Sequence, residues 1–356
     1  MSPAAVPSGL SRRGELLLSV QDLQAYFDTD DGVVKAVDGV TFDIHRGEVF
    51  AVVGESGSGK SVTATTIMGL QPTIRIAGGS VSWKGRDLLH LPEAEHRRIR
   101  GGEIAMIFQD PLTALNPVHT VGRQIGEMAR IHEGLSRKAA HERAVEMIDL
   151  VGIPEARKRA DMYPHEFSGG MRQRAMIAMA ITCKPDLLIA DEPTTALDVT
   201  VQAQVLDVLL AIKDEIDSAI MLITHDLGVV AGLADRVMVM YAGRQAEIGT
   251  AAELFYQTRH PYTLGLLASL PRLDGGDDEE LVPIEGSPPS LINVPPGCAF
   301  HPRCRFAELP GRCDHERPAL RSVTADGHVT ACHFAERLAE VSVESMRTSA
   351  APEAGA

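Results

Sequence analysis

Short, fully apolar runs that stop at a polar residue or a glycine recur along the chain. Runs of this kind are typical of buried parallel strands, and helical patterns lie between them. The first four runs are residues 49–53, 104–108, 187–190 and 219–223. They stop at Gly54, at Gln109, at Asp191 with Glu192, and at Thr224 with His225. Because ligands of an open parallel sheet bind at the carboxyl ends of its strands, we expect one crevice to gather these residues.

Two further patterns flank these strands. Apolar and polar residues alternate over residues 16–27 and 33–44, and residues 81–87 suggest a hairpin, so a small antiparallel β region is expected. From residue 118 to residue 184 the apolar spacing becomes helical. The predicted fold class is therefore α/β, with a parallel-sheet core, an antiparallel β region and an inserted helical region.

A glycine-rich stretch joins the first apolar run to a predicted helix and has the pattern G-x-x-x-x-G-K-S of a phosphate-binding loop. Its glycines let backbone N–H groups face a polyphosphate, and the helix N-terminus favours negative charge. Lys60 is expected to reach the β- and γ-phosphates of a nucleotide, and Ser61 to ligate Mg²⁺. The strand before and the helix after disfavour the alternative of a surface turn. The residues assigned to this loop are Gly54, Glu55, Ser56, Gly57, Ser58, Gly59, Lys60, Ser61 and Val62.

Carboxylates end the third apolar run, where their burial is costly unless a metal or a proton is at hand. Asp191 suits a Mg²⁺ site, directly or through water, and Glu192 suits a general base that orients water. Gln109 is a candidate metal or water ligand, although a lone polar residue at a strand end is unremarkable. Residues 168–170, Ser-Gly-Gly, open a predicted helix and are either an anion site or a helix cap.

Composition limits the classes of function. The 356 residues carry a net charge of −14 and only 4% aromatics, which argues against nucleic acid as the main partner. Hydrophobic residues make up 44% of the chain, as in globular proteins, yet no apolar run approaches about 18 residues, so no membrane span is expected. The N-terminus has no long apolar core and is not expected to be a signal peptide. The chain is predicted to stay in the cytosol, where cysteines are reduced or bound to metal.

In their order and spacing, these motifs resemble those of ABC transporter ATPases across residues 16–258. The phosphate loop is similar to the Walker A motif, Gln109 to the Q-loop, residues 187–192 to Walker B, and His225 to the switch histidine. Two more stretches resemble the signature motif, with Phe for Leu and Met for Gln, and the D-loop. They are Phe167-Ser168-Gly169-Gly170-Met171-Arg172-Gln173 and Ala196-Leu197-Asp198. The resemblance implies a P-loop NTPase fold of ABC type, with a RecA-like parallel-sheet core.

The likeness narrows to the oligopeptide, dipeptide and nickel importer branch and then covers residues 16–335. The matching stretches are residues 106–117, 191–200, 260–263 and 286–289, with the cysteine-rich segment that follows. Residues 61–63, with residues 30–32 before them, resemble the first of the two paralogous ATPase subunits that these importers use. Tyr26 and Phe27 are both candidates for stacking on adenine, on opposite faces of a strand, and the resemblance favours Phe27.

The resemblance also implies a mechanism and partners. ATP with Mg²⁺ would sit on the Walker A loop and face Ser168, Gly169 and Gly170 of a second, paralogous ATPase subunit, with Asp198 also at the nucleotide. Ser61, Gln109 and Asp191 would place Mg²⁺, Glu192 would polarise water, and His225 would contact the γ-phosphate. Two separate permease chains, and indirectly an extracytoplasmic substrate-binding protein, would complete a peptide importer at the cytoplasmic face of a bacterial membrane. The alternatives are a soluble ABC ATPase acting on nucleic acid or ribosomes and a P-loop kinase outside the ABC class.

Four segments are predicted along the chain. Residues 1–14 are expected to be a disordered tail, and residues 15–258 a nucleotide-binding domain whose helical region spans 118–184. Residues 259–335 form an importer-type extension, and residues 336–356 a second tail.

The extension contains Cys298, Cys304, Cys313 and Cys332 in a segment rich in Pro and Gly, which usually needs a staple to become ordered. Their spacing has none of the close C-x₂₋₄-C pairs that zinc sites favour. Four thiolates with varied spacing are compatible with an iron–sulfur cluster. A [4Fe–4S] cluster is therefore expected, with Zn²⁺, reduced thiols or disulfides as alternatives.

Overall fold

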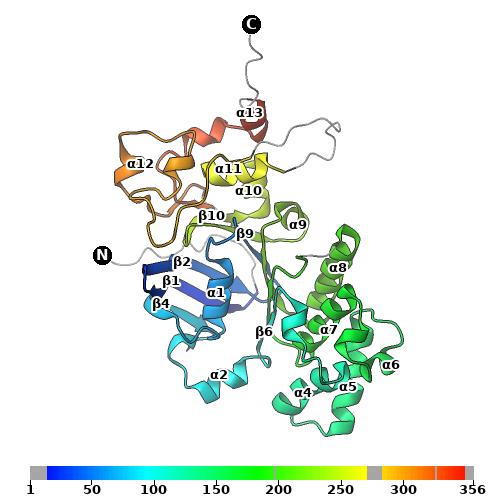
Figure 1. Cartoon of the computed structure of the whole chain (residues 1–356). Coiled ribbons are helices and arrows are strands. Elements are labelled where there is room, and N and C mark those ends of the chain that lie inside the picture. Colours follow the sequence, from blue (N-terminus) through cyan, green and yellow to red (C-terminus); the bar gives the residue numbers. More distant parts are fainter. Residues whose placement is uncertain (1–13, 196–197, 271–282, 325–326, 349–356) are drawn as a thin grey trace.

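The computed structural model describes residues 14–195, 198–270, 283–324 and 327–348 (Figure 1). An eight-stranded sheet lies at its centre, in the order β11-β12-β10-β9-β3-β8-β7-β6. Its parallel part is formed by β3 (Val49–Val53), β6 (Ile104–Ile107), β7 (Leu187–Asp191), β8 (Ala219–Thr224) and β9 (Arg236–Tyr241). These strands are buried along their whole length. The expectation drawn from their uninterrupted apolar runs is confirmed.

A second, antiparallel sheet packs beside helix α1 (Lys60–Ile67), in the order β2-β1-β4-β5 (Figure 1). Its strands are β1 (Leu16–Thr29), β2 (Gly32–His45), β4 (Arg75–Trp83) and β5 (Arg86–Asp87). One hydrophobic core joins it to the main sheet, and within that core Phe42 stacks on Phe50 with ring centroids 5.0 Å apart. The predicted antiparallel β region is therefore present and shares its core with the parallel strands.

Helices form a separate lobe on the β6 side of the main sheet (Figure 1). They are α3 (Pro111–Ala114), α4 (Val121–His132), α5 (Arg137–Leu150), α6 (Ala156–Ala160) and α7 (Gly169–Ile181), with α2 (Glu93–Ile99) before them and α8 (Val199–Ile216) after them. A second core, which contains Ile125, Ile148 and Ile177, packs helices α3 to α8 onto the opposite face of the parallel strands. Helix α2 packs through Ile99 into the first core. The helical pattern predicted over residues 118–184 is confirmed.

The C-terminal part of the chain lies at the other end of the sheet, around α10 and α11 (Figure 1). It comprises α9 (Leu227–Ala231), β10 (Arg244–Thr250), α10 (Ala251–Tyr256), α11 (Pro261–Ala268), α12 (Arg312–His315), β11 (Arg321–Ser322), β12 (Val329–Thr330) and α13 (Val343–Thr348). Single 3₁₀ turns occur at Leu88–His90, Pro164–Glu166, His301–Arg303 and Arg337–Glu340. Strand β12 pairs antiparallel with β10, so the extension adds two short strands to the main sheet.

The structure corrects the prediction of a tail over residues 336–356, since α13 folds back onto α11. Met346 is buried in a small core with Leu264 and Ala268, and Val341 and Val343 pack against it. These apolar side chains cover surface on α11 that would otherwise be exposed to water. Residues 1–13 and 349–356, which include most of the predicted N-terminal tail, lie outside the described residues.

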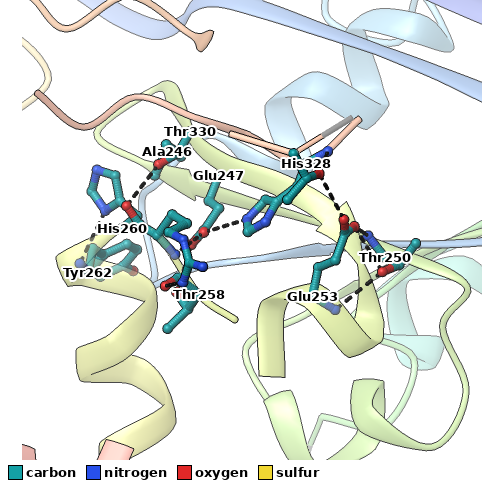
Figure 2. Close-up of polar contacts among 11 residues, drawn as sticks. Ala246, Glu247, Thr250, Glu253, Thr258, His260, Tyr262, His328 and Thr330 are labelled. Atoms are coloured by element: carbon teal, nitrogen blue, oxygen red, sulfur yellow. Dashed lines mark hydrogen bonds and ion pairs between the residues drawn. The ribbon is translucent and has the colours of Figure 1, made fainter. Parts of the chain in front are cut away.

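A buried polar network attaches the extension to β10 (Figure 2). The carboxylate of Glu247 is fully buried and accepts hydrogen bonds from the His328 imidazole Nε2 at 2.7 Å and the Thr258 hydroxyl at 2.9 Å. The backbone N–H of Arg259 is a third donor. A buried carboxylate is tolerated when its lone pairs are satisfied in this way. His328 comes from the extension, so this network fastens residues that are far apart in the sequence.

Candidate functional site

The phosphate loop runs from β3 to α1 and turns through glycines with positive φ. Gly54 has φ 152° and Gly59 has φ 102°. A Cβ atom on Gly54 would lie 2.3 Å from the carbonyl oxygen of Met240, and one on Gly59 would lie 2.2 Å from that of Ala36. No side chain fits at either position. Because no side chain caps the N-terminus of α1, its backbone N–H groups are available to an anion.

Lys60 is buried at the base of this loop, with 4% of its surface exposed. Its Nζ donates hydrogen bonds to the carbonyl oxygens of Gly54 at 2.8 Å and Glu55 at 2.9 Å. Burial lowers the pKa of Lys60, and the carboxylates of Glu192, Asp191 and Glu55 act against that shift. Phosphate oxygens are stronger acceptors for an ammonium group than backbone carbonyls. The lysine is therefore placed to exchange these carbonyls for a polyphosphate.

Ser61 and Asp191 meet where α1 begins and β7 ends. The Ser61 hydroxyl donates a hydrogen bond to Asp191 Oδ1 at 2.9 Å. Burial raises the pKa of Asp191, and the hydrogen bond from Ser61 opposes that shift. Two oxygen donors, one of them a buried carboxylate, form the kind of donor set that suits Mg²⁺. These residues therefore fit the predicted divalent cation.

Glu192 lies at the centre of a second group at the same edge of the sheet. Its Oε2 accepts hydrogen bonds from Gln109 Nε2 at 3.0 Å and from the Thr195 hydroxyl at 2.9 Å. His225 Nδ1 lies 3.5 Å from the other carboxylate oxygen, Oε1. The backbone of Glu192 itself has φ 45°, which is unusual for a residue other than glycine. The four predicted strand ends thus meet at one edge of the sheet, and Gln109 contacts the predicted base, Glu192.

Sequence reasoning missed Thr195 as a partner of Glu192. A turn connects the two residues, because the backbone N–H of Thr195 donates to the carbonyl oxygen of Glu192 at 3.1 Å. The sequence signal that could have identified Thr195 is a hydroxyl residue three positions after a carboxylate at a strand end, since threonine side chains form hydrogen bonds with nearby groups in turns.

Two of the residues predicted to lie at a nucleotide cap helices within this chain: Ser168, predicted to face the nucleotide of a second subunit, and Asp198, predicted to lie at the nucleotide. Ser168 caps α7 by accepting from the Met171 N–H at 3.3 Å, and Asp198 caps α8 by accepting from the Val201 N–H at 3.0 Å. Across the described segments, no hydrogen bond or ion pair joins residues 168–170 to residues 54–61. Ala196 and Leu197 of the predicted D-loop lie outside the described residues.

The two aromatic candidates for adenine stacking have different surroundings. The Tyr26 hydroxyl donates a hydrogen bond to Asp38 Oδ1 at 2.8 Å, and the Arg75 guanidinium lies 5.6 Å from its ring centroid. Burial raises the pKa of Tyr26 to about 12. Tyr26 is thus held by the antiparallel sheet, while neighbouring Phe27 is half-buried. Phe27 as the stacking residue stays a prediction.

The four cysteines of the extension line one cavity of about 270 Å³. Burial raises the pKa of Cys304 to about 12 and that of Cys332 to about 11, so both thiols are protonated at neutral pH. The cysteines are free rather than paired. Within the described ranges, no three His, Cys, Asp or Glu side chains are grouped closely enough to hold a metal ion. The predicted iron–sulfur cluster, and the zinc alternative, therefore lack support from a preformed ligand set.

The fold and this site together define an ATP-binding cassette ATPase. The ABC transporter family model matches residues 37–195, and the model for the C-terminal region of oligopeptide/dipeptide transporters matches residues 246–310. A dimeric ATP-binding cassette solved in a post-hydrolysis state with ADP and phosphate superposes with a TM-score of 0.60 at 24% identity, covering 66% of this chain and 99% of that chain. This likeness concerns the fold alone.

Relatives of high sequence identity indicate to which branch of the ABC family the chain belongs. The chain is 53% identical over 336 residues to the dipeptide transport ATP-binding protein DppD of Bacillus subtilis, covering 93% of this chain and 98% of the relative. It is 55% identical over 291 residues to the oligopeptide transport ATP-binding protein OppD of Haemophilus influenzae, covering 82% and 90%. The chain belongs to the family of ATP-binding proteins of oligopeptide/dipeptide ABC transporters. The predicted fold class and family are confirmed. No helix of the described segments has both the length and the apolar character needed to cross a membrane.

Proposed function

We propose that this chain is the subunit that hydrolyses ATP to drive peptide uptake by an ABC importer. The observation that carries the proposal is that Lys60, the Ser61–Asp191 pair and the Glu192 group converge at one edge of the parallel sheet. The family relationship to dipeptide and oligopeptide transport proteins supports the class of solute.

The family resemblance and the contacts at the sheet edge support the following roles. The loop amides and Lys60 hold the phosphates, and Phe27 stacks on the adenine. Ser61 and Asp191 would hold Mg²⁺, which would supply charge neutralisation to the phosphates. Glu192 orients and deprotonates the attacking water. Gln109 and Thr195 hold the Glu192 carboxylate in place. His225 contacts Glu192 and the γ-phosphate. Catalysis of this kind depends chiefly on positioning and on charge stabilisation.

A second ATPase subunit completes the site in this proposal, because Ser168, Gly169 and Gly170 serve the nucleotide of the partner, with Asp198 beside them. Dimer closure on ATP transmits motion through the helical lobe to two permease chains, which place this subunit at the cytoplasmic face of the membrane. An extracytoplasmic binding protein delivers the peptide to the permeases. The alternative of an ABC ATPase acting on nucleic acid is disfavoured by the family relationship and by the net charge of −14.

We expect the functional unit to be a heterodimer with a paralogous ATPase. The experiment co-expresses a tagged form of this chain with the two permeases, with and without the paralogue, and measures composition and ATPase activity. The expected complex contains one copy of each ATPase and is active only with both. As a control, the tag is moved to the paralogue, which should recover the same complex. A stable, fully active assembly with two copies of this chain would contradict the heterodimer.

We also propose that the four-cysteine cavity holds a [4Fe–4S] cluster. Its support is that all four thiols line one cavity of about 270 Å³. Because the described cysteines are not grouped as a ligand set, cluster binding would have to draw the four thiols together. Metal binding would keep the buried thiols deprotonated, because thiolates are the ligands. The role of the cluster would be to order the extension.

Anaerobically purified protein should therefore be brown, with an absorbance at about 400 nm, and Cys304→Ser should abolish this absorbance. Cys183→Ser is the matched control, because Cys183 follows α7 and does not line the cavity. A colourless protein that contains stoichiometric zinc would contradict the iron–sulfur cluster and show that the cavity binds zinc instead. Metal-free protein whose extension is nevertheless ordered would contradict both the iron–sulfur and the zinc hypotheses.

A further inference from the structure

The C-terminal extension contacts the phosphate loop through an arginine that the proposed mechanism leaves unused. Arg303, at the end of the 3₁₀ turn His301–Arg303, forms a two-pronged ion pair with Glu55. Its Nη1 lies 2.6 Å from Glu55 Oε2 and its Nη2 lies 2.9 Å from Oε1. The Arg303 side chain is only 5% exposed and that of Glu55 is 27% exposed. Paired hydrogen bonds between charged groups at a shielded site are among the stronger polar contacts in proteins.

A tyrosine from α11 holds the same loop residue at its backbone. The Tyr262 hydroxyl accepts a hydrogen bond from the Glu55 N–H at 2.8 Å, and the tyrosine side chain is fully buried. Burial raises the pKa of Tyr262 above its usual value, so the hydroxyl stays neutral. The backbone and the carboxylate of Glu55 are thus both fixed from outside the loop.

Arg303 is itself held in place from several sides. Its Nε donates to the carbonyl oxygen of Glu285 at 2.9 Å, and its Nη2 donates to that of Ile284 at 3.3 Å. The guanidinium carbon also lies 5.8 Å from the ring centroid of Tyr241, at the end of β9. A guanidinium restrained in this way loses little freedom when it pairs with a carboxylate. Arg303 is therefore a rigid support for the loop.

Lys60 provides the third contact to Glu55, and ATP binding would remove it. The ammonium group now donates to the Glu55 carbonyl oxygen at 2.9 Å, and it must leave that oxygen to reach phosphates. The Ser58 N–H, within the loop, also donates to that oxygen at 3.2 Å. In the part of the chain that the structure describes, the contacts to Glu55 from outside the loop are those of Arg303 and Tyr262, and ATP binding would leave both in place. We propose that Arg303 and Tyr262 are positioning residues for ATP binding, which keep the phosphate loop in its receptive conformation when Lys60 turns to the nucleotide. This inference rests on the proposed assignment of residues 54–61 as the ATP site.

The test uses the assembled importer and measures kcat and KM for ATP. Arg303→Met should raise the KM about tenfold and change kcat less than about threefold, because loop order is lost while Glu192 is untouched. Glu55→Gln should give the same rise, and the double variant should be no worse than either single one, since both remove the same contact. Arg303→Lys should recover part of the affinity, because it restores a charge but not the two-pronged geometry.

The matched control is Arg312→Met, which breaks an arginine–glutamate pair of the same extension, with Glu316 at 2.9 Å, away from the loop. Its KM should equal that of the wild type. Should Arg303→Met fail to fold, Tyr262→Phe removes only the hydroxyl and should still raise the KM. An unchanged KM in the folded variants, with only a lower melting temperature, would overturn the inference and leave a purely structural contact. Lys60→Ala distinguishes the inference about Arg303 and Tyr262 from the proposed ATP site on which it rests. Normal ATP binding by this variant would refute the proposed ATP site itself.

Discussion

Replacement of Glu192 by glutamine is expected to stop ATP hydrolysis while leaving ATP binding intact. The amide keeps the size of the carboxylate and can still form hydrogen bonds near Gln109, Thr195 and His225, but it does not accept a proton from water. Loss of a positioned general base typically slows a reaction by about 10²–10⁴-fold. Because hydrolysis is proposed to release the ATP-bound dimer, Glu192→Gln should accumulate in that state.

The measurements are steady-state ATPase activity, ATP affinity, and the fraction of dimer in the presence of ATP and Mg²⁺. Glu146→Gln is the matched control, since Glu146 is an exposed carboxylate on α5 that pairs with Arg143. It should behave as the wild type. Hydrolysis by Glu192→Gln at a rate within a few-fold of the wild type would refute the assignment of the base.

Replacement of His328 by alanine is expected to lower the free energy of unfolding by about 1–3 kcal/mol, because it removes one hydrogen-bond partner of a fully buried carboxylate. Glu247 would keep hydrogen bonds from Thr258 and Arg259 but would lose its donor from the extension. The amides of β11 and β12 should lose protection against hydrogen exchange first, since these strands connect to the sheet beside this pair.

Chemical denaturation with hydrogen exchange read out by mass spectrometry tests this expectation. His315→Ala is the control, because His315 is 75% exposed and its contact with Asp314 is 3.5 Å long. Exposed pairs of this kind contribute about 0–1 kcal/mol. A loss below about 1 kcal/mol in His328→Ala, with protection of β11 and β12 unchanged, would show that the network does not fasten the extension.

Elements whose signals are local could be predicted from the sequence. The strand Val49–Val53 is apolar at every position, and a strand buried on both faces requires that pattern. The phosphate loop is a run of eight residues in which backbone crowding requires glycine at Gly54 and Gly59, so its sequence is sufficient to identify it. The meeting of Gln109 and Glu192 was predictable because parallel strands place their carboxyl ends at one edge.

Contacts between residues distant in sequence were decided by the tertiary structure alone. Arg303 and Glu55 are 248 residues apart, and an arginine in a loop carries no mark of the carboxylate that it will meet. Strand β12 has two residues, too few for any period, and its place beside β10 depends on the buried Glu247–His328 pair. The sequence determined which chemistry the sheet edge carries, because that chemistry lies in short motifs. The packing of the extension determined how the loop is supported, because that support needs surfaces that only folding brings together.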